Sequence, residues 1–473
     1  MRALVSMSLC RVPCKVSDQW RVYRLLRLPW LPDDERSPGF LLCKQQFLGA
    51  GAGLVIVPTL ARLQALKIKT KDFSICCRRK VQFCFSHFVG GVVKTTQQVL
   101  ASFDSAAEQL ASLTAIDPQF VLVFASPEWF GDSRFYPLLR TAFPQAHLLG
   151  CSTAGEISTH GILDRGCVVT AVHLDQARVE VFADQVSDID DSTAAGSRLA
   201  AKLAGADPAA VLLFAPGVNI NGTALVDGLA AGLKPGVRIM GGLAGDDAAF
   251  RETFTLTDEG VSMRAVVAAA LPAGLTVGTG SFGGWKPFGP ARKVTRCEGS
   301  ILYELDGEPA LEVYKRYLGE YAKDLPASGL LFPFEMLDAG HRQEGLIRTI
   351  LGVDEAAGSL ALAGAIIPDG YLRLMRASTD ALVEGANAAA VASCTGLPPS
   401  AVPGLAILVS CVGRKLVMGG RTEEEVETVG EIMGAGTQLA GFYSYGEISP
   451  FSVTTDCKLH NQTMTISYLR EDL

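Results

Sequence analysis

The amino-acid sequence predicts a mixed α/β protein with two lobes, built from repeated strand–helix–strand units and additional antiparallel strands. One order of segments occurs three times: an apolar run, a helical stretch, a second apolar run and a glycine-rich loop. The chain has 473 residues, of which 48% are hydrophobic and 19% charged, so it can bury a substantial core in about two or three domains. This composition excludes a disordered or collagen-like chain.

The first 92 residues differ from the rest of the chain. Residues 1–95 hold 16 Lys and Arg against 5 Asp and Glu, and six of the twelve cysteines lie before residue 85. The apolar run 47–61 is interrupted by glycines and Pro58, and it is too short to cross a bilayer. We therefore expect residues 1–92 to lie outside the fold, as upstream sequence read from a start assigned too early, with Val92 or Val93 as the initiator. A basic tail that contacts a partner or anionic lipid is the alternative.

The first repeat begins with residues 97–113, whose apolar residues recur at helical spacing. Residues 120–124 are a short apolar run typical of a strand buried on both faces. A helical stretch to about residue 143, a strand at 147–149 and the loop 150–156 complete this repeat.

The same order of segments returns twice. The second repeat has a strand at 210–214, a helix at 222–233, a strand at 237–240 and a loop at 241–247, and the third has 405–409, 421–434, 437–440 and 441–447. Strand–helix–strand units imply parallel strands joined by right-handed crossovers. Ligands tend to bind beyond the carboxyl ends of such strands, so the three loops are the expected site.

The first and third loops match residue by residue. The aligned pairs are Gly150 with Gly441, Thr153 with Ser444, Gly155 with Gly446, Glu156 with Glu447 and Ile157 with Ile448. The middle loop keeps only Gly245-Asp246. Tight turns that need a positive φ explain the glycines adequately, whereas an acid repeated after the same glycine is harder to explain by a turn, so structural and functional roles both stay open for the acids.

The remaining segments suggest antiparallel strands. The expected pairs are 166–174 with 179–183 and 254–257 with 265–271, followed by strands at 275–280, 292–296 and 302–305 and a helix at 309–318. We place a domain boundary near residues 298–300, which gives domains of residues 93–300 and 301–473.

Several kinds of chemistry find no support in the sequence. Gly278-x-Gly280-x-x-Gly283 matches a dinucleotide-binding fingerprint by letters, but the prolines at 287 and 290 cannot open the helix that the pyrophosphate needs. The six histidines do not cluster at metal-ligand spacing, and no C-x-x-C pair indicates zinc. Residues 96–473 hold 26 Lys and Arg against 44 Asp and Glu, which argues against binding to nucleic acid.

The residues that remain suggest a binding site. The candidate ligand-binding residues are Cys151, Ser152, Thr153, Gly155, Glu156, Gly242, Asp246, Asp247, Trp285, Arg414, Tyr443, Ser444, Tyr445, Glu447 and Asn461. Carboxylates, aromatic walls and one arginine could together bind a zwitterion such as an amino acid. The alternative is that the aromatic residues pack in the core and that Arg414 forms a structural salt bridge with one of residues 423–425 or with Glu447.

Six motifs follow one another along the chain: Gly150-Cys-Ser-Thr-Ala-Gly-Glu156, Gly284-Trp-Lys-Pro-Phe-Gly289, Tyr303-Glu-Leu-Asp-Gly-Glu-Pro-Ala310, Ser410-Cys-Val-Gly-Arg-Lys415, Gly441-Phe-Tyr-Ser-Tyr-Gly-Glu-Ile-Ser-Pro450 and Leu459-His-Asn-Gln-Thr-Met-Thr465. Together they resemble the FIST family (F-box and intracellular signal transduction proteins), with an amino-terminal domain followed by a carboxy-terminal one over residues 97–469.

The resemblance implies a bacterial, cytoplasmic sensory module and not an enzyme. Such domains are thought to bind small ligands, amino acids among them, and to act with histidine kinases, diguanylate cyclases or chemoreceptors. We therefore expect no cofactor, no binding to membrane or nucleic acid, and a separate signalling partner. Residues 26–60 do not resemble an F-box, which argues against a ubiquitin-ligase role.

Two alternatives remain open. Some relatives bind haem and sense nitric oxide, and haem b would require an axial ligand such as His160 or His460. A thiol-dependent enzyme would use Cys151 with His160, or Cys411 with Glu447. That enzyme would require a thiol pKa below the usual value.

Overall fold

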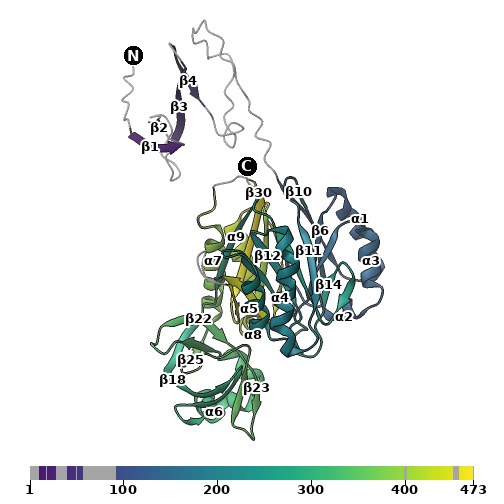
Figure 1. Cartoon of the computed structure of the whole chain (residues 1–473), viewed down its shortest axis with the longest axis vertical. Helices are drawn as coiled ribbons and strands as arrows, with labels where there is room; N and C mark the ends of the chain where they lie inside the picture. The colour runs from purple at the N-terminus through teal and green to yellow at the C-terminus, as the bar shows by residue number, and fades with distance from the viewer. Residues whose placement is uncertain are drawn as a thin grey trace. The chain divides into compact units, whose positions relative to one another are not determined.

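The computed structural model describes residues 10–16, 19–27, 40–48, 51–56, 92–398, 402–450 and 457–471 (Figure 1). The chain divides into two compact units, Met1–Ser86 and His87–Leu473. In the first unit, four antiparallel strands pair in chain order: β1 (Cys10–Val16), β2 (Gln19–Arg27), β3 (Phe40–Leu48) and β4 (Gly51–Ile56). The expectation that residues 1–92 lie outside the native fold remains a prediction.

The second unit contains the three predicted repeats. The first repeat comprises β5 (Val93–Leu100), α1 (Phe103–Leu113), β6 (Phe120–Ala125), α2 (Pro127–Gly131), α3 (Phe135–Ala142), β7 (His147–Ser152), β8 (Glu156–Ser158), β9 (Gly161–Leu163) and β10 (Cys167–Leu174). The second comprises β11 (Glu180–Gln185), α4 (Ser192–Leu203), β12 (Ala210–Ala215), α5 (Gly222–Gly232), β13 (Arg238–Leu243), β14 (Thr255–Thr257), β15 (Gly260–Ser262) and β16 (Ala265–Leu271). The third comprises β17 (Leu275–Phe282), α7 (Thr379–Cys394), β26 (Leu405–Cys411), α8 (Val412–Met418), α9 (Glu423–Met433), β27 (Gln438–Ser444), β28 (Gly446–Pro450), β29 (Cys457–His460) and β30 (Met464–Glu471).

Each repeat forms most of one six-stranded sheet, and the three sheets have the same strand order. The orders are β15-β14-β7-β6-β10-β5, β29-β28-β13-β12-β16-β11 and β9-β8-β27-β26-β30-β17. The central pairs β6–β7, β12–β13 and β26–β27 are parallel, as predicted. The fold class, a mixed α/β protein with repeated strand–helix–strand units and additional antiparallel strands, is therefore confirmed.

The outer hairpin of each sheet comes from another repeat. The hairpin β8–β9 of the first repeat pairs with β27 of the third, β14–β15 of the second pairs with β7 of the first, and β28–β29 of the third pairs with β13 of the second. This cyclic exchange relates the repeats by an approximate threefold symmetry. Phe124, Phe214 and Phe442 pack against one another in the shared core, with ring centroids 4.8–5.9 Å apart.

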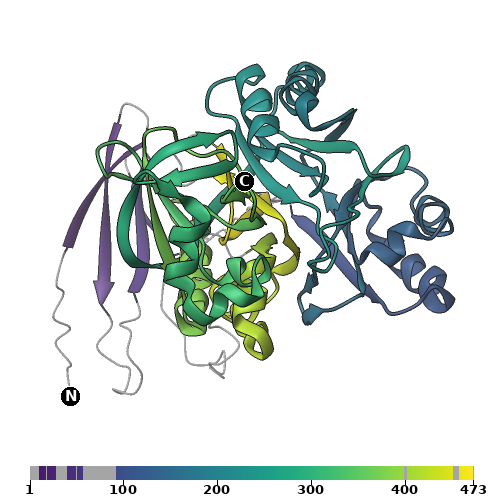
Figure 2. The ribbon, with the colours of Figure 1, turned by 90° about the horizontal axis from the view of Figure 1, so that it is seen from below.

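A curled antiparallel sheet is inserted into the third repeat, between β17 and α7. It contains β18 (Lys286–Glu298), β19 (Ile301–Leu305), β20 (Glu308–Pro309), β21 (Phe334–Leu337), β22 (Gln343–Arg348), β23 (Ile350–Asp354), β24 (Ser359–Leu362) and β25 (Tyr371–Arg376), with α6 (Ala310–Leu318). Figure 1 shows it as a green lobe below the repeats, and it faces the viewer in Figure 2. It has its own hydrophobic core around Tyr314 and Leu302.

Two local expectations were wrong. Residues 97–100, predicted as the start of the helix 97–113, belong to the edge strand β5, because pairing with β10 outweighs their helix-like spacing, and α1 begins at Phe103. The expected hairpins do not form either: β10 pairs with β5 and β6, and β11 pairs with β16. The last strand of each repeat lies between earlier strands of the same sheet: β10 lies between β5 and β6, and β16 lies between β11 and β12. Strands that follow one another in the chain, such as β10 and β11, therefore belong to different sheets.

Candidate functional site

The three predicted loops meet at the approximate threefold axis, and this meeting point is called the hub below. Main-chain hydrogen bonds join them in a ring: Ala154 N to Tyr443 O (2.9 Å), Gly245 N to Ser152 O (2.8 Å) and Tyr445 N to Leu243 O (3.2 Å). Most of the predicted site residues are buried here, so the loops come together as predicted but pack against each other. The hub is therefore a structural centre of the fold.

Glu156 and Glu447 lie at equivalent positions of the hub, as the sequence alignment predicted. Glu156 accepts hydrogen bonds from Thr153 Oγ1 (2.5 Å) and Gly166 N (2.8 Å), and Glu447 accepts them from Ser444 Oγ (2.6 Å), Thr463 N (3.1 Å) and Thr463 Oγ1 (2.9 Å). In both repeats the glutamate thus bonds both to its own loop and to the residue that precedes the last strand of the repeat, β10 in the first and β30 in the third. Burial raises the pKa of both carboxyl groups to about 7.

We expect the substitution Glu447→Gln to flatten the pH dependence of stability. The folded-state pKa of Glu447 is about 7 against an ordinary 4.5, so the folded protein binds more protons than the unfolded chain between these values. The carboxyl group therefore lowers the free energy of unfolding as pH rises through this interval, and the amide cannot.

Urea unfolding at several pH values between 4.5 and 7 gives the free energy of unfolding of each protein, and the expected effect is a smaller slope against pH in the variant than in the wild type. His460 acts in the opposite direction because burial lowers its pKa to about 4, but its contribution is common to both proteins. An unchanged slope in the variant would contradict the assignment of the titration to Glu447.

The middle repeat departs from the alignment. Thr255, and not Asp246, occupies the position of Glu156 and Glu447. The strand partners of these three residues are Cys151 for Thr255, Phe442 for Glu156 and Gly242 for Glu447, and each partner directly follows the equivalent glycine of its strand. Asp246 instead begins an extra loop, where its carboxylate accepts hydrogen bonds from the main-chain N–H groups of residues 250–252 and from the Tyr445 hydroxyl. Asp247 is exposed and pairs with Arg165 at 3.5 Å.

Arg414 is not available to a ligand, and the salt-bridge alternative holds. Its side chain is 0% exposed, and its Nη2 and Nε lie 2.7 and 3.2 Å from Glu425 Oε2. The remaining donors bind the carbonyl oxygens of Gly283 and Leu382. Tyr443 donates its hydroxyl to the other oxygen of Glu425 at 2.7 Å, so both predicted residues belong to one buried network.

The other predicted residues fill structural positions. Cys151 packs in the shared core, Gly155 adopts a φ of +135°, and a Cβ on Gly242 would lie 2.7 Å from the Val409 side chain. Trp285 donates to the main-chain oxygen of Gln462 at 2.8 Å. Asn461 is 1% exposed, and its Oδ1 has no hydrogen-bond partner among the described residues. The prediction of a shared pocket from these residues therefore finds no support in their packing.

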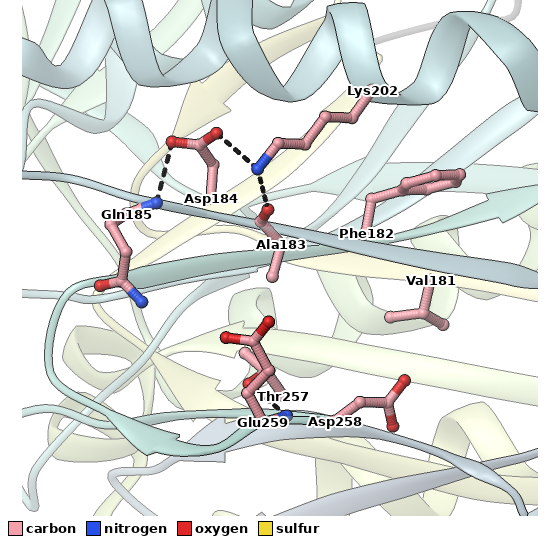
Figure 3. A pocket seen from close by; sticks show the side chains of 9 residues that line it. All are labelled: Val181, Phe182, Ala183, Asp184, Gln185, Lys202, Thr257, Asp258 and Glu259. Carbon is pink, nitrogen blue, oxygen red and sulfur yellow. Dashed lines mark hydrogen bonds and ion pairs between the residues drawn. The ribbon is translucent and has the colours of Figure 1, made fainter.

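A cavity lies elsewhere, between β11, α4 and the turn that joins β14 to β15 (Figure 3). Its volume is about 320 Å³, and its lining residues are Val181, Phe182, Ala183, Asp184, Gln185, Lys202, Thr257, Asp258 and Glu259. The cavity joins two sheets, because β11 belongs to the second sheet and β14–β15 pairs with the first.

Charged side chains line this cavity: Lys202 and the carboxylates of Asp184, Asp258 and Glu259. Lys202 reaches it from α4, with Nζ 2.8 Å from Asp184 Oδ2 and 2.6 Å from Ala183 O. Glu259 lies in the β14–β15 turn, on the opposite side of the β11 ribbon from the Lys202 ammonium group (Figure 3), and its carboxylate forms no hydrogen bond or ion pair with any described residue. Asp258 is already neutralised by Arg140 at 2.8 Å and also binds His147 at 2.6 Å.

Sequence reasoning missed this cavity for a simple reason. Lys202 and Glu259 are distant in the chain, and neither lies in a repeated motif. The only local signal is the acidic turn Asp258-Glu259-Gly260, which resembles any exposed hairpin turn.

Neither histidine proposed for haem fits an axial ligand as it is placed. His160 is exposed. His460 is 1% exposed, its Nε2 lies 2.7 Å from Ser449 O and its Nδ1 lies 3.5 Å from Ser281 Oγ. Both ring nitrogens of His460 are thus engaged, whereas an iron ligand needs one of them free.

The thiols do not match the thiol-enzyme alternative either. Burial raises the pKa of both the Cys151 and the Cys411 thiol, and the Glu447 carboxylate raises the pKa of Cys411 further. A reactive cysteine requires a shift in the other direction.

The fold is that of a mixed α/β protein: three repeats exchange their outer hairpins, and an antiparallel sheet is inserted into the third. In this chain, the FIST N domain matches residues 119–308 and the FIST C domain matches residues 310–450. The chain belongs to the FIST family, whose domains are sensory modules of signal transduction.

The curated relatives are uncharacterized. One from Mycobacterium tuberculosis is 28% identical over 46% of this chain and 57% of its own length, and one from Mycobacterium bovis is 27% identical over 56% and 65%. One from Methanocaldococcus jannaschii is 35% identical over 18% of this chain and 17% of its own length. The chain thus spans less than two thirds of the length of these relatives. Among the described residues, no helix has the length and apolar character needed to cross a membrane.

Proposed function

We propose that this chain is a cytoplasmic sensory protein that binds a small zwitterion, such as an amino acid, in the cavity between β11 and the β14–β15 turn. The observation that carries the proposal is a cavity of about 320 Å³ lined both by the ammonium group of Lys202 and by the unpaired carboxylate of Glu259. That volume lies at the lower end of the usual range for small-molecule sites, about 300–1,000 Å³, which suits a ligand of this size.

Each group of a zwitterion has a counterpart in the cavity. Lys202 uses its ammonium group on Asp184 and on one carbonyl oxygen, which leaves one proton for a ligand carboxylate. Glu259 offers an unpaired carboxylate to a ligand ammonium group. Val181 and Ala183, which point to the same face of β11, supply an apolar wall for the ligand side chain (Figure 3).

The position of the cavity supports a signalling role. A ligand in contact with both β11 and the β14–β15 turn would favour whichever arrangement of the two sheets places both charges within reach. We propose that a separate histidine kinase, diguanylate cyclase or chemoreceptor binds that arrangement preferentially.

Calorimetric titration with the individual amino acids tests the proposal. At least one amino acid should bind, and Glu259→Gln should weaken its binding by about tenfold or more because a charge-assisted hydrogen bond contributes about 1.5–3 kcal/mol. Lys202→Met should have a similar effect. Glu108→Gln is the matched control, since Glu108 is an exposed glutamate on α1 away from the cavity.

Two results would contradict the proposal. Equal binding by wild type and Glu259→Gln would move the ligand site away from this cavity. A Soret band in protein purified from haem-replete cells, shifted by nitric oxide, would instead support the haem alternative.

A further inference from the structure

Arg348 carries a buried positive charge at the junction between the inserted sheet and the repeats. It ends β22, and its side chain is 2% exposed. Its Nε donates to Ala365 O at 3.1 Å, and its Nη1 donates to the carbonyl oxygens of Ile347 and Leu459, each at 3.2 Å. Its Nη2 donates to no described residue, and no described carboxylate lies within 4.0 Å of the guanidinium.

This charge is incompletely balanced by the protein. Burial lowers the pKa of Arg348 to about 10, so the guanidinium is still protonated at neutral pH. The Asp227 carboxylate of α5 also acts on Arg348 and raises its pKa, but it lies beyond 4.0 Å and pairs with Lys458 at 3.4 Å. Carbonyl dipoles and a distant carboxylate compensate a buried charge only in part, so its burial remains unfavourable. An anion beside the guanidinium would relieve this cost.

The first turn of α5 adds to the positive potential at the same place. Thr223 lies in that turn, and its hydroxyl oxygen is buried without a hydrogen-bond partner. A Cβ placed on Gly364 would lie 2.9 Å from Arg348 Nε and 3.3 Å from Thr223 Oγ1. The guanidinium and the hydroxyl group therefore both lie beside Gly364 and close to each other. The Asn221 side chain already accepts a hydrogen bond from one N–H of this turn, that of Ala224 at 3.1 Å. Helix amino termini attract anions through the N–H groups that remain.

We propose that Arg348, Thr223 and the first turn of α5 bind an oxyanion, such as a phosphate or carboxylate group. Arg348 belongs to the inserted sheet, whereas α5 and β29 belong to the repeats. A bound oxyanion therefore stabilises the contact between the two lobes. This site shares no residue with the cavity, so it does not depend on the proposed function.

Thermal unfolding of the full chain tests the site with inorganic phosphate and acetate, each compared with chloride at equal ionic strength. Phosphate or acetate should raise the unfolding midpoint in a saturable way, as binding to the folded state requires. The two arms distinguish a phosphate site from a carboxylate site. Arg348→Met should lose the effect, whereas Arg251→Met should keep it, because Arg251 is exposed and forms no ion pair with a described residue.

Two outcomes would overturn the proposal. One is that neither anion stabilises the wild type more than chloride does, and the other is that Arg348→Met responds like the wild type. If Arg348→Met fails to fold, the isosteric Thr223→Val decides the question. It should raise the anion concentration needed for half-maximal stabilisation by about tenfold, the equivalent of about 1.4 kcal/mol, and an unchanged response overturns the proposal.

Discussion

Replacing Arg414 by methionine is expected to lower the free energy of unfolding by about 3–5 kcal/mol, because it leaves the buried carboxylate of Glu425 without its counter-ion. Both side chains are 0% exposed and share a hydrogen bond of 2.7 Å. Glu425 also accepts hydrogen bonds from Ser410 at 2.9 Å and Tyr443 at 2.7 Å, so the loss would spread to β26 and β27. Urea unfolding followed by far-ultraviolet circular dichroism measures the change.

Two comparisons make this experiment specific. Arg421→Met breaks ion pairs of a half-exposed arginine with Asp380 and Glu424, and such surface pairs contribute little. The double variant Arg414→Met/Glu425→Leu should be less destabilised than the sum of the two single variants, since it removes both buried charges together. Similar effects for Arg414→Met and Arg421→Met would contradict the buried network.

Replacing Gly441 by alanine is expected to destabilise the protein by about 3 kcal/mol, the upper end of the usual range for overpacking. A Cβ at this position would lie 1.9 Å from the carbonyl oxygen of Leu408, on the parallel neighbour β26. The obstacle is main chain, so no side-chain rotation can relieve it. Gly150 and Gly241 approach the carbonyl oxygens of Val123 and Leu213 in the same way, at 1.9 and 2.0 Å.

Gly131→Ala is the matched control for this substitution. Gly131 ends α2 and has no atom within 4 Å of its Cβ position, so alanine there should be neutral or slightly stabilising. If Gly441→Ala unfolds at the same urea concentration as Gly131→Ala, the close approach of the neighbouring strand does not require glycine at these positions.

The sequence predicted the elements whose signal is local. Short apolar runs such as 120–124 and 210–214 became the buried strands β6 and β12, because strands covered on both faces need continuous apolar side chains. The loop alignment of Glu156 with Glu447 was confirmed by their equivalent hydrogen bonds. Repetition made these signals readable without knowledge of long-range contacts.

The candidate site could not be predicted in the same way. A run of glycines and acids at the ends of strands predicts convergence, but it does not show whether the converging loops leave a cavity or close on one another. Here Tyr443 and Arg414 face Glu425 in the interior, and their hydrogen bonds are satisfied within the protein. The open cavity lies instead beside Glu259, in a turn that carries no distinctive pattern.

The sequence by itself determined the repeated α/β units, their parallel central strands and the family of the chain, because these depend on residues close together in the chain. Only the tertiary structure decided the exchange of hairpins, the insertion of the second lobe and the position of the cavity. Each of these depends on pairing between distant segments, such as Gly441 with Ile157. Hydrophobic periodicity encodes which face of a strand is buried, and it carries no information on which distant strand will cover it.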